Sequence, residues 1–142
     1  MQPPPAPSTF DLDRFFIGRT RAWGMFQDRF GTVRRQFKVT IEGRREGPEL
    51  LLAEDFVFDD GETEARLWRI RRAADGRYEG TAGDVVGVAH GEVHGRMLRW
   101  RYAFDLRVGE RKWRVRFDDR MFQQDDEVVV GRARVEKFGF TL

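Results

Sequence analysis

Apolar and polar residues alternate through most of this 142-residue chain, and this pattern limits the folds open to it. In MLRWRYAFDLRV, residues 97–108, the apolar Leu98, Trp100 and Tyr102 are separated by arginines or small residues. The segments TVRRQFKVTIEG and KWRVRF repeat the pattern. Successive side chains of a strand point to opposite faces, so the alternation is typical of antiparallel strands with one buried and one solvated face.

Turn sequences separate these segments. Asp-Gly or His-Gly pairs stand at residues 60–61, 75–76 and 94–95, and such pairs supply the positive φ angles of tight hairpins. About eight to nine hairpin-linked strands would form a meander, and closing it removes both unpaired edges. We therefore expect an all-β fold, a single antiparallel up-and-down barrel. A two-sheet sandwich is the alternative.

The N-terminal residues follow a different pattern. Residues 1–9, MQPPPAPST, are rich in Pro and predict a flexible, extended tail. The segment that follows, FDLDRFFIG, predicts a short helix whose Phe15 and Phe16 cap one end of the barrel as a hydrophobic plug. The barrel domain is expected over residues 10–142.

Charge and composition argue against a nucleic-acid partner and against any chemistry that needs cysteine. The chain has 26 Lys and Arg against 24 Asp and Glu, with the signs interleaved and a formal net charge of +2. A nucleic-acid binder carries a basic footprint, so no nucleic-acid partner is expected. The absence of Cys excludes disulfides, thiol catalysis and cysteine-bound zinc.

The same sequence contains no membrane or export signal. No apolar run approaches the ~18 residues that a membrane span needs. The first residues lack the basic and apolar regions of a signal peptide. We expect a cytoplasmic protein, or a periplasmic one if an export segment is missing from this chain. The oligomeric state is left open.

Strand parity places three polar side chains inside the expected barrel. In KWRVRFDD the apolar residues face the core, which puts Asp119 inside and Asp118 outside. These neighbouring aspartates therefore do not form a carboxylate pair acting on one substrate. The same argument places Glu54 and Arg66 inside on their own strands.

This interior trio admits three interpretations. Arg66 bridges the two carboxylates in a buried ion network, because an unpaired buried charge costs several kcal/mol. Alternatively, the trio lines a cavity and holds the polar head of an amphiphilic ligand, with Arg66 as an anion clamp. In the third interpretation Asp119 or Glu54 is a catalytic base. Carboxylates beside an Arg tend to have lowered pKa values, which suits charge balance better than a general acid.

Small residues predict unfilled volume in the barrel. Val85, Gly87, Ala89 and Gly91 are expected to share one inward face. The volume beside them forms a ligand cavity or accommodates the N-terminal phenylalanines and large aromatic side chains. The candidate ligand-binding residues are Glu54, Arg66, Trp68, Trp100, Tyr102, Trp113 and Asp119.

Motifs for cofactors and metals are not recognisable. GRYEGTAGDVVG is rich in Gly but lacks the features of a phosphate-binding loop or a dinucleotide fingerprint. His90 and His94 are expected to face solvent or lie in turns rather than bind a metal. No cofactor, no metal and no catalytic residue is assigned.

Several segments, in order, resemble a bacterial family of unknown function whose members are often described as lipoproteins. They are FFIGRTRAWGMFQDRFG, EDFVFDDGE, GRYEGTAGDVVGVAHGE, LRWRYAFDL, FDDRMF and KFGF, between Phe10 and Leu142. The resemblance implies a lipocalin-like barrel and supplies no reaction. This chain lacks the lipid-carrying Cys, so membrane anchoring is not implied. Lipocalins pack a Trp of the first strand at the closed barrel end, and Trp23 is expected to play a similar role.

The expected function is noncatalytic binding of a small hydrophobic or amphiphilic molecule, such as a lipid, inside the barrel. The alternatives are a barrel enzyme, isomerase- or cyclase-like, that uses an interior carboxylate, and an interaction module without a cavity. An open cavity with an unpaired carboxylate favours the enzyme, and one with a fully paired trio favours ligand carriage. A filled barrel leaves only the interaction module.

Overall fold

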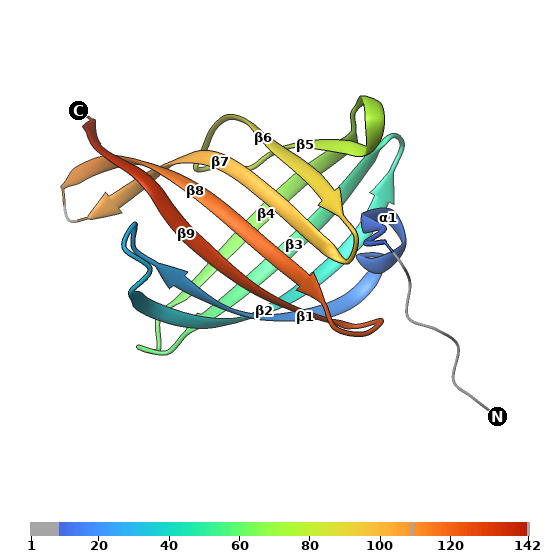
Figure 1. Ribbon diagram of the computed structural model, residues 1–142, viewed down its shortest axis with the longest axis horizontal. Helices are drawn as coiled ribbons and strands as arrows, with labels where there is room; N and C mark the ends of the chain where they lie inside the picture. The colour runs from blue at the N-terminus through green and yellow to red at the C-terminus, as the bar shows by residue number, and fades with distance from the viewer. Residues whose placement is uncertain (1–8, 109, 142) are drawn as a thin grey trace.

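The computed structural model describes residues 9–108 and 110–141. Within them, strands account for most of the chain and helix for very little, as Figure 1 shows. The elements are α1 (Leu12–Phe15), β1 (Gly18–Gln27), β2 (Val33–Glu46), β3 (Glu49–Phe58), β4 (Thr63–Arg72), the 3-10 turn η1 (Ala74–Gly76), β5 (Arg77–Thr81), β6 (Val85–His94), β7 (Met97–Val108), β8 (Arg111–Gln123) and β9 (Val128–Thr141). The expected tail lies outside the described residues apart from Thr9, which is exposed.

The strands form one closed barrel in the order of the sequence. Each strand pairs antiparallel with the next, and β1 pairs with β9 in parallel. In an up-and-down barrel with an odd number of strands, the first and last strands run in the same direction, so the closing pair has to be parallel. The predicted all-β barrel with a short N-terminal helix is confirmed. The expectation that every pair is antiparallel is wrong for the closing pair.

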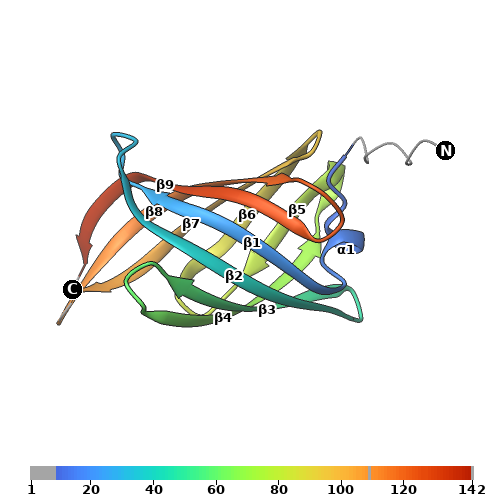
Figure 2. The same ribbon diagram turned by 90° about the horizontal axis from the view of Figure 1, so that it is seen from below.

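One end of the barrel is filled by the N-terminal segment. Figures 1 and 2 both place α1 at that end. Phe10, Leu12, Phe15 and Phe16 are buried in the core. The three phenylalanine rings lie in mutual contact, with centroids 4.9–5.8 Å apart. The predicted hydrophobic plug is confirmed.

The opposite end is filled by a cluster of phenylalanine rings. Phe26 lies near the end of β1. The centroid of its ring is 5.0–6.1 Å from those of Phe37, Phe58 and Phe117. Phe56 joins the cluster by stacking on Phe58 at 5.9 Å. These rings bury apolar surface and fill the end of the barrel, which the backbones of the strands alone would leave open.

Small residues inside the barrel mostly make room for aromatic rings. A Cβ atom on Gly91 would lie 2.6 Å from Trp100 Cζ3, and one on Gly80 would lie 2.7 Å from Trp100 Cζ2. Ala89 is fully buried on the same inward face. Gly87 was expected to face inward with it. It is exposed instead, with φ +67°, in the irregular part of β6 where the register with β7 shifts.

Trp23 does not take the role expected from lipocalins. It pairs with Lys38 of β2 and Val130 of β9 and is 37% exposed. Its ring is covered on one side by the guanidinium of Arg21, 5.4 Å from the ring centroid. The burial at the closed end comes from the N-terminal phenylalanines. No helix in the described part of the chain has the length and apolarity that crossing a membrane requires.

The contact between Trp100 and the two glycines can be tested by adding one methyl group. We expect Gly91→Ala to destabilise the fold by about 1–3 kcal/mol, because overpacking forces the indole out of place. Gly83→Ala is the control, since a Cβ at that position meets nothing within 4 Å. Urea unfolding measures both.

A second substitution shows whether the cause is the indole. Trp100→Leu costs stability by itself but removes the clash, so the double variant should lose less than the sum of the two single losses. Additive losses would contradict the assigned contact.

Candidate functional site

A cavity of about 90 Å³ lies inside the barrel between the N-terminal plug and the phenylalanine cluster. Leu12 and Phe16 of the plug line it at one end, and Phe26 and Phe37 line it at the other. Most of its remaining wall is aliphatic and aromatic, from Val39, Ile41, Leu52, Phe56, Ile70, Leu98, Met121 and Val129. The barrel is therefore filled at both ends and hollow between them.

Six of the seven predicted site residues line this cavity: Glu54, Arg66, Trp68, Trp100, Tyr102 and Asp119. Pairing explains part of this grouping, because Glu54 stands opposite Arg66 in β3–β4 and Trp100 stands opposite Asp119 in β7–β8. Trp113 is not part of the wall. It lies further along the inward row of β8, half-buried against the core.

Asp119 is the polar group on the β8 side of the cavity. The Tyr102 hydroxyl donates a hydrogen bond to its Oδ2 at 2.8 Å, while the buried Oδ1 has no hydrogen-bond partner. Burial raises the pKa of Asp119 to about 7, against the lowering effects of the Tyr102 hydrogen bond and the Arg66 charge. The negative charge of Glu54 adds to the rise.

Glu54 reaches the same cavity from β3. Its Oε1 is buried and also lacks a hydrogen-bond partner. Burial raises the pKa of Glu54 to about 7, and the Arg66 charge and a hydrogen bond from the Trp68 side chain offset only part of this effect. The expectation of lowered carboxyl pKa values beside Arg66 is wrong, because removal from water outweighs the attraction of the cation.

Arg66 does not bridge the two carboxylates as the ion-network interpretation requires. Among the described side chains, its ion pair is with Glu64, with Nη2 3.1 Å from Oε1. Its guanidinium carbon lies 5.2 Å from the centroid of Phe56 and 4.8 Å from that of Phe104. Arg66 is thus held between two rings and a neighbouring carboxylate, so its charge reaches the cavity without a direct contact to Glu54 or Asp119.

Tyr102 stays a hydrogen-bond donor in this environment. Burial raises the pKa of its hydroxyl well above the ordinary value, and the charge of Asp119 adds to that effect. Its ring packs edge-on against Trp68, with centroids 5.5 Å apart. The hydroxyl is therefore fixed in position and protonated, and it orients the Asp119 carboxyl group.

Asp118 points to the outer face, as strand parity predicted. Its carboxylate accepts bonds from Nε and Nη2 of Arg99, the shortest at 2.7 Å. Although burial by itself raises the pKa of Asp118, the Arg99 contacts outweigh it and the net pKa is lowered. The two neighbouring aspartates therefore have opposite electrostatic surroundings and do not act together.

Sequence reasoning missed the contribution of the plug to the cavity. It treated Phe15 and Phe16 as filling and did not include Leu12 or Phe16 in the wall. Parity also places Met121 after Asp119 on the inward row of β8, and Met121 lines the cavity. It was not among the candidate ligand-binding residues, because a flexible apolar side chain carries no chemical signal of its own.

The described residues contain no group of three or more His, Asp or Glu side chains that could hold a metal ion. His94 contacts Glu92, with Nε2 3.3 Å from Oε2. His90 is exposed on β6.

Comparison with known proteins identifies the family. A family model described as "Protein of unknown function (DUF3833)" matches residues 5–142. The chain belongs to the DUF3833 family. Neither the curated proteins nor the solved structures contain a significant match to it. The DUF3833 match agrees with the expected resemblance to a family of unknown function, and it assigns no activity.

The two raised carboxyl pKa values make stability depend on pH. In the unfolded chain the pKa values of Asp119 and Glu54 are near their ordinary values of 3.8 and 4.5, respectively. In the folded barrel both pKa values are about 7. The folded state therefore holds protons that the unfolded state releases, so stability falls as pH rises from about 4 to about 7. Above that range both carboxyl groups are ionised in the folded state, and the full cost of burying their charges lowers the stability.

We expect Glu54→Gln to be more stable than the wild type by a few kcal/mol at about pH 8, because the amide has no ionisation penalty. At about pH 4 the two proteins should be nearly equal, since the carboxyl is protonated in both states. Urea unfolding across this range measures the difference. Asp55→Asn, which changes the exposed neighbour of Glu54, is the control and should keep the wild-type profile. A Glu54→Gln profile parallel to that of the wild type would refute the buried carboxyl.

Proposed function

We propose that the barrel binds a small, mainly apolar molecule that carries a hydrogen-bond donor, such as an amine or a hydroxyl group. The observation that carries the proposal is the pair of buried carboxyl oxygens without partners, Glu54 Oε1 and Asp119 Oδ1, in an otherwise apolar cavity. An unsatisfied buried acceptor costs about 1–3 kcal/mol, and a ligand that donates to it recovers this energy. Aromatic and aliphatic walls would hold the rest of the molecule.

The size of the cavity favours a compact ligand. An apolar cavity of roughly 150 Å³ accepts benzene, and drug-sized ligands occupy roughly 300–1,000 Å³. At about 90 Å³ the cavity holds a molecule of few heavy atoms, unless side chains of its wall move aside. A complete lipid would require displacement of the plug or of the phenylalanine cluster. The lipocalin-like character implied by the resemblance is compatible with a closed barrel that takes its ligand inside.

Arg66 has a different role in this proposal from the one expected. An anion clamp needs a free guanidinium, but Arg66 is paired with Glu64 and covered by two rings. Arg132 also lines the cavity but belongs to the outer row of β9. On the inward rows, the groups left open toward the cavity are carboxyls, which accept from a donor and attract a cation. The ligand head is therefore a donor, not an anion.

Acid–base catalysis is the second candidate, and the pKa values favour it. A carboxyl group with a pKa near 7 can both accept and release a proton at neutral pH, which general catalysis requires. An unpaired interior carboxylate beside an open cavity is also the feature that we expected of an isomerase-like barrel. A module that acts only through its outer faces is less well supported, because the barrel is not filled.

A series of four probes of similar shape tests the binding proposal. Calorimetry should show isobutylamine and isobutanol binding about tenfold or more tightly than isopentane, because only they donate to the carboxyl oxygens. Isobutyrate should not bind, since its charge would lie beside two acidic groups. Equal binding of all four probes, or binding of isobutyrate alone, would rule out the proposed recognition.

Variants separate the charge from the hydrogen bond. Glu54→Gln keeps an acceptor but loses the negative charge, so isobutylamine should bind more weakly while the affinity for isobutanol changes little. Asp55→Asn is the matched control on the outer face. For the catalytic candidate, NMR would follow hydrogen–deuterium exchange beside the carbonyl of acetone. Exchange faster than buffer and lost in Glu54→Gln and Asp119→Asn would favour catalysis over simple binding.

A further inference from the structure

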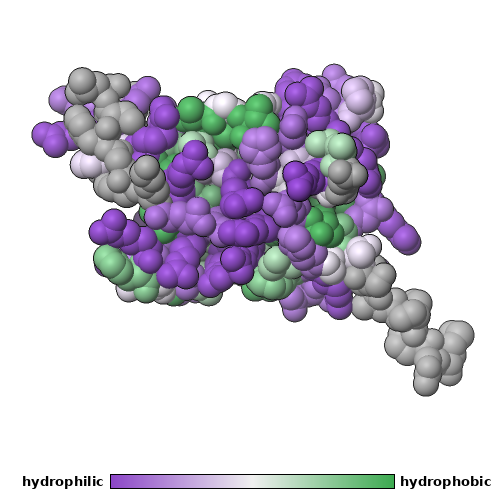
Figure 3. Space-filling view, turned by 45° about the horizontal axis from the view of Figure 1, so that its top comes forward, coloured by the Kyte–Doolittle hydropathy of each residue, from purple (hydrophilic) through white to green (hydrophobic). Residues whose placement is uncertain are grey.

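A second feature lies on the outside of the barrel, and it shares Arg132 with the lining of the cavity. Strands β7, β8 and β9 carry arginines directly opposite one another: Arg99 pairs with Arg120, and Arg120 pairs with Arg132. Like charges at directly opposed positions repel and destabilise a sheet. A row of three arginines therefore needs other interactions that offset the repulsion between their charges. The face shown in Figure 3 is mostly hydrophilic over its centre, with hydrophobic areas at its margins.

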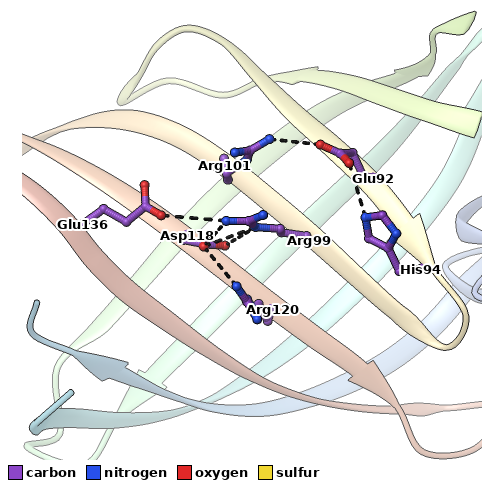
Figure 4. Close-up of polar contacts among 7 residues, drawn as sticks. All are labelled: Glu92, His94, Arg99, Arg101, Asp118, Arg120 and Glu136. Carbon is purple, nitrogen blue, oxygen red and sulfur yellow. Dashed lines mark hydrogen bonds and ion pairs between the residues drawn. The ribbon is translucent and has the colours of Figure 1, made fainter.

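Asp118 organises the centre of this row. Its side chain is only 8% exposed, and it pairs with Arg99 at 2.7 Å and with Arg120 at 3.7 Å. Figure 4 shows these arginines converging on it from β7 and β8, with Glu136 of β9 on the other side of Arg99. One buried carboxylate thus fixes two guanidinium groups, which reduces the conformational freedom they would lose on binding a ligand.

The arginines border a groove of about 410 Å³. Its lining contains five arginines, at positions 29, 99, 120, 132 and 134, and two acids, Asp118 and Glu136, which leaves a formal excess of three positive charges. Among the described side chains, Arg132 has no ion pair or hydrogen bond. Arg134 donates only to the Arg29 carbonyl oxygen, at 3.2 Å. Arg29 has no ion pair among these side chains either, and its guanidinium carbon lies 5.0 Å from the centroid of the Phe30 ring. Three guanidinium groups of the described lining are therefore without a counter-charge.

Beside the groove, part of the positive charge on the outer face is neutralised by acids. On the same outer face, Arg101 pairs with Glu92 at 3.0 Å, and Arg114 pairs with Asp105 at 2.7 Å. A nucleic-acid chain would need a continuous basic track, which these acids interrupt. A single compact anion needs only the groove.

We propose that this groove binds a phosphoryl group through Arg120, Arg132 and Arg134. A phosphomonoester carries a charge of roughly −1.5 to −2 and three acceptor oxygens, which fits the excess charge better than a carboxylate does. Planar guanidinium groups bind such oxygens in pairs. The phosphoryl group belongs either to a small soluble molecule or to a lipid headgroup, and the two sources share this chemistry.

Calorimetry at low ionic strength tests the proposal with inorganic phosphate as the probe. The double variant Arg132→Gln, Arg134→Gln should lose at least about tenfold in affinity, because it removes two of the three guanidinium groups that lack a counter-charge. The matched control is Arg69→Gln, Arg71→Gln. It removes the same charge from β4, where the arginines lie near Glu49 and Glu79, and it should stay within about twofold of the wild type. Arg132→Lys, Arg134→Lys should fall between them, since Lys keeps the charge but not the paired donors.

Vesicles separate the two sources of the phosphoryl group. Phosphatidylcholine vesicles with added phosphatidic acid should bind the protein more than phosphatidylcholine alone if the ligand is a headgroup, and equally poorly if it is soluble. In either case the groove variant must lose binding and the control must keep it. The proposal would be overturned if the groove Gln variant and the β4 control variant lost equal affinity. It would also be overturned if neither phosphate nor vesicles bound the protein, or if a DNA oligonucleotide bound more tightly than they do. Circular dichroism of each variant confirms that a loss does not reflect unfolding.

Discussion

The parallel pairing of β1 with β9 is the constraint on which the rest of the structure depends. It closes a meander with an odd number of strands, and it sets the inward rows of the two strands side by side, with Ala22 beside Val129 and Gly24 beside Gly131. The inward side chains of all the strands then face one interior. That interior is too wide to be filled by the strands alone, so the N-terminal phenylalanines and a cluster of strand phenylalanines fill its two ends.

Between those two ends, the interior side chains are in a low-dielectric environment. Glu54 and Asp119 approach the cavity from different strands, and neither is neutralised by a direct ion pair with Arg66. The negative charge of Glu54 adds to the cost of ionising Asp119. The Tyr102 hydroxyl fixes one of them by hydrogen bonding. The result is a pair of acids that exchange protons near neutral pH at a site from which bulk water is largely excluded.

The sequence predicted the barrel and the inward direction of the key polar residues, because both follow from a period of two. Parity correctly separated Asp118 from Asp119 and brought Glu54 and Arg66 to one interior. It could not predict that the Arg66 guanidinium pairs with Glu64, since that depends on how a long side chain bends between Phe56 and Phe104. The predicted direction of the carboxyl pKa shifts was also wrong, because Arg66 does not contact either carboxyl group directly. A charge at a distance lowers a pKa less than burial raises it.

Other errors came from features that alternation does not encode. The irregular segment of β6 turns Gly87 outward, and nothing in the neighbouring residues marks where the register shifts. Trp113 continues the inward row of β8 but lies beyond the cavity, because parity gives the face of a residue and not its depth along the barrel. The basic groove was also hidden in the overall charge of +2, since the arginines gather only when β7, β8 and β9 lie side by side.

The most direct test of the account is an NMR titration of the side-chain carboxyl carbons of Glu54 and Asp119 in the ligand-free protein. The account predicts that both titrate around 7, in overlapping steps, and that Glu54→Gln lowers the midpoint of Asp119 by removing a neighbouring negative charge. Midpoints near the ordinary carboxyl values of about 4 would show that the cavity is open to bulk water, and they would contradict the buried acid pair.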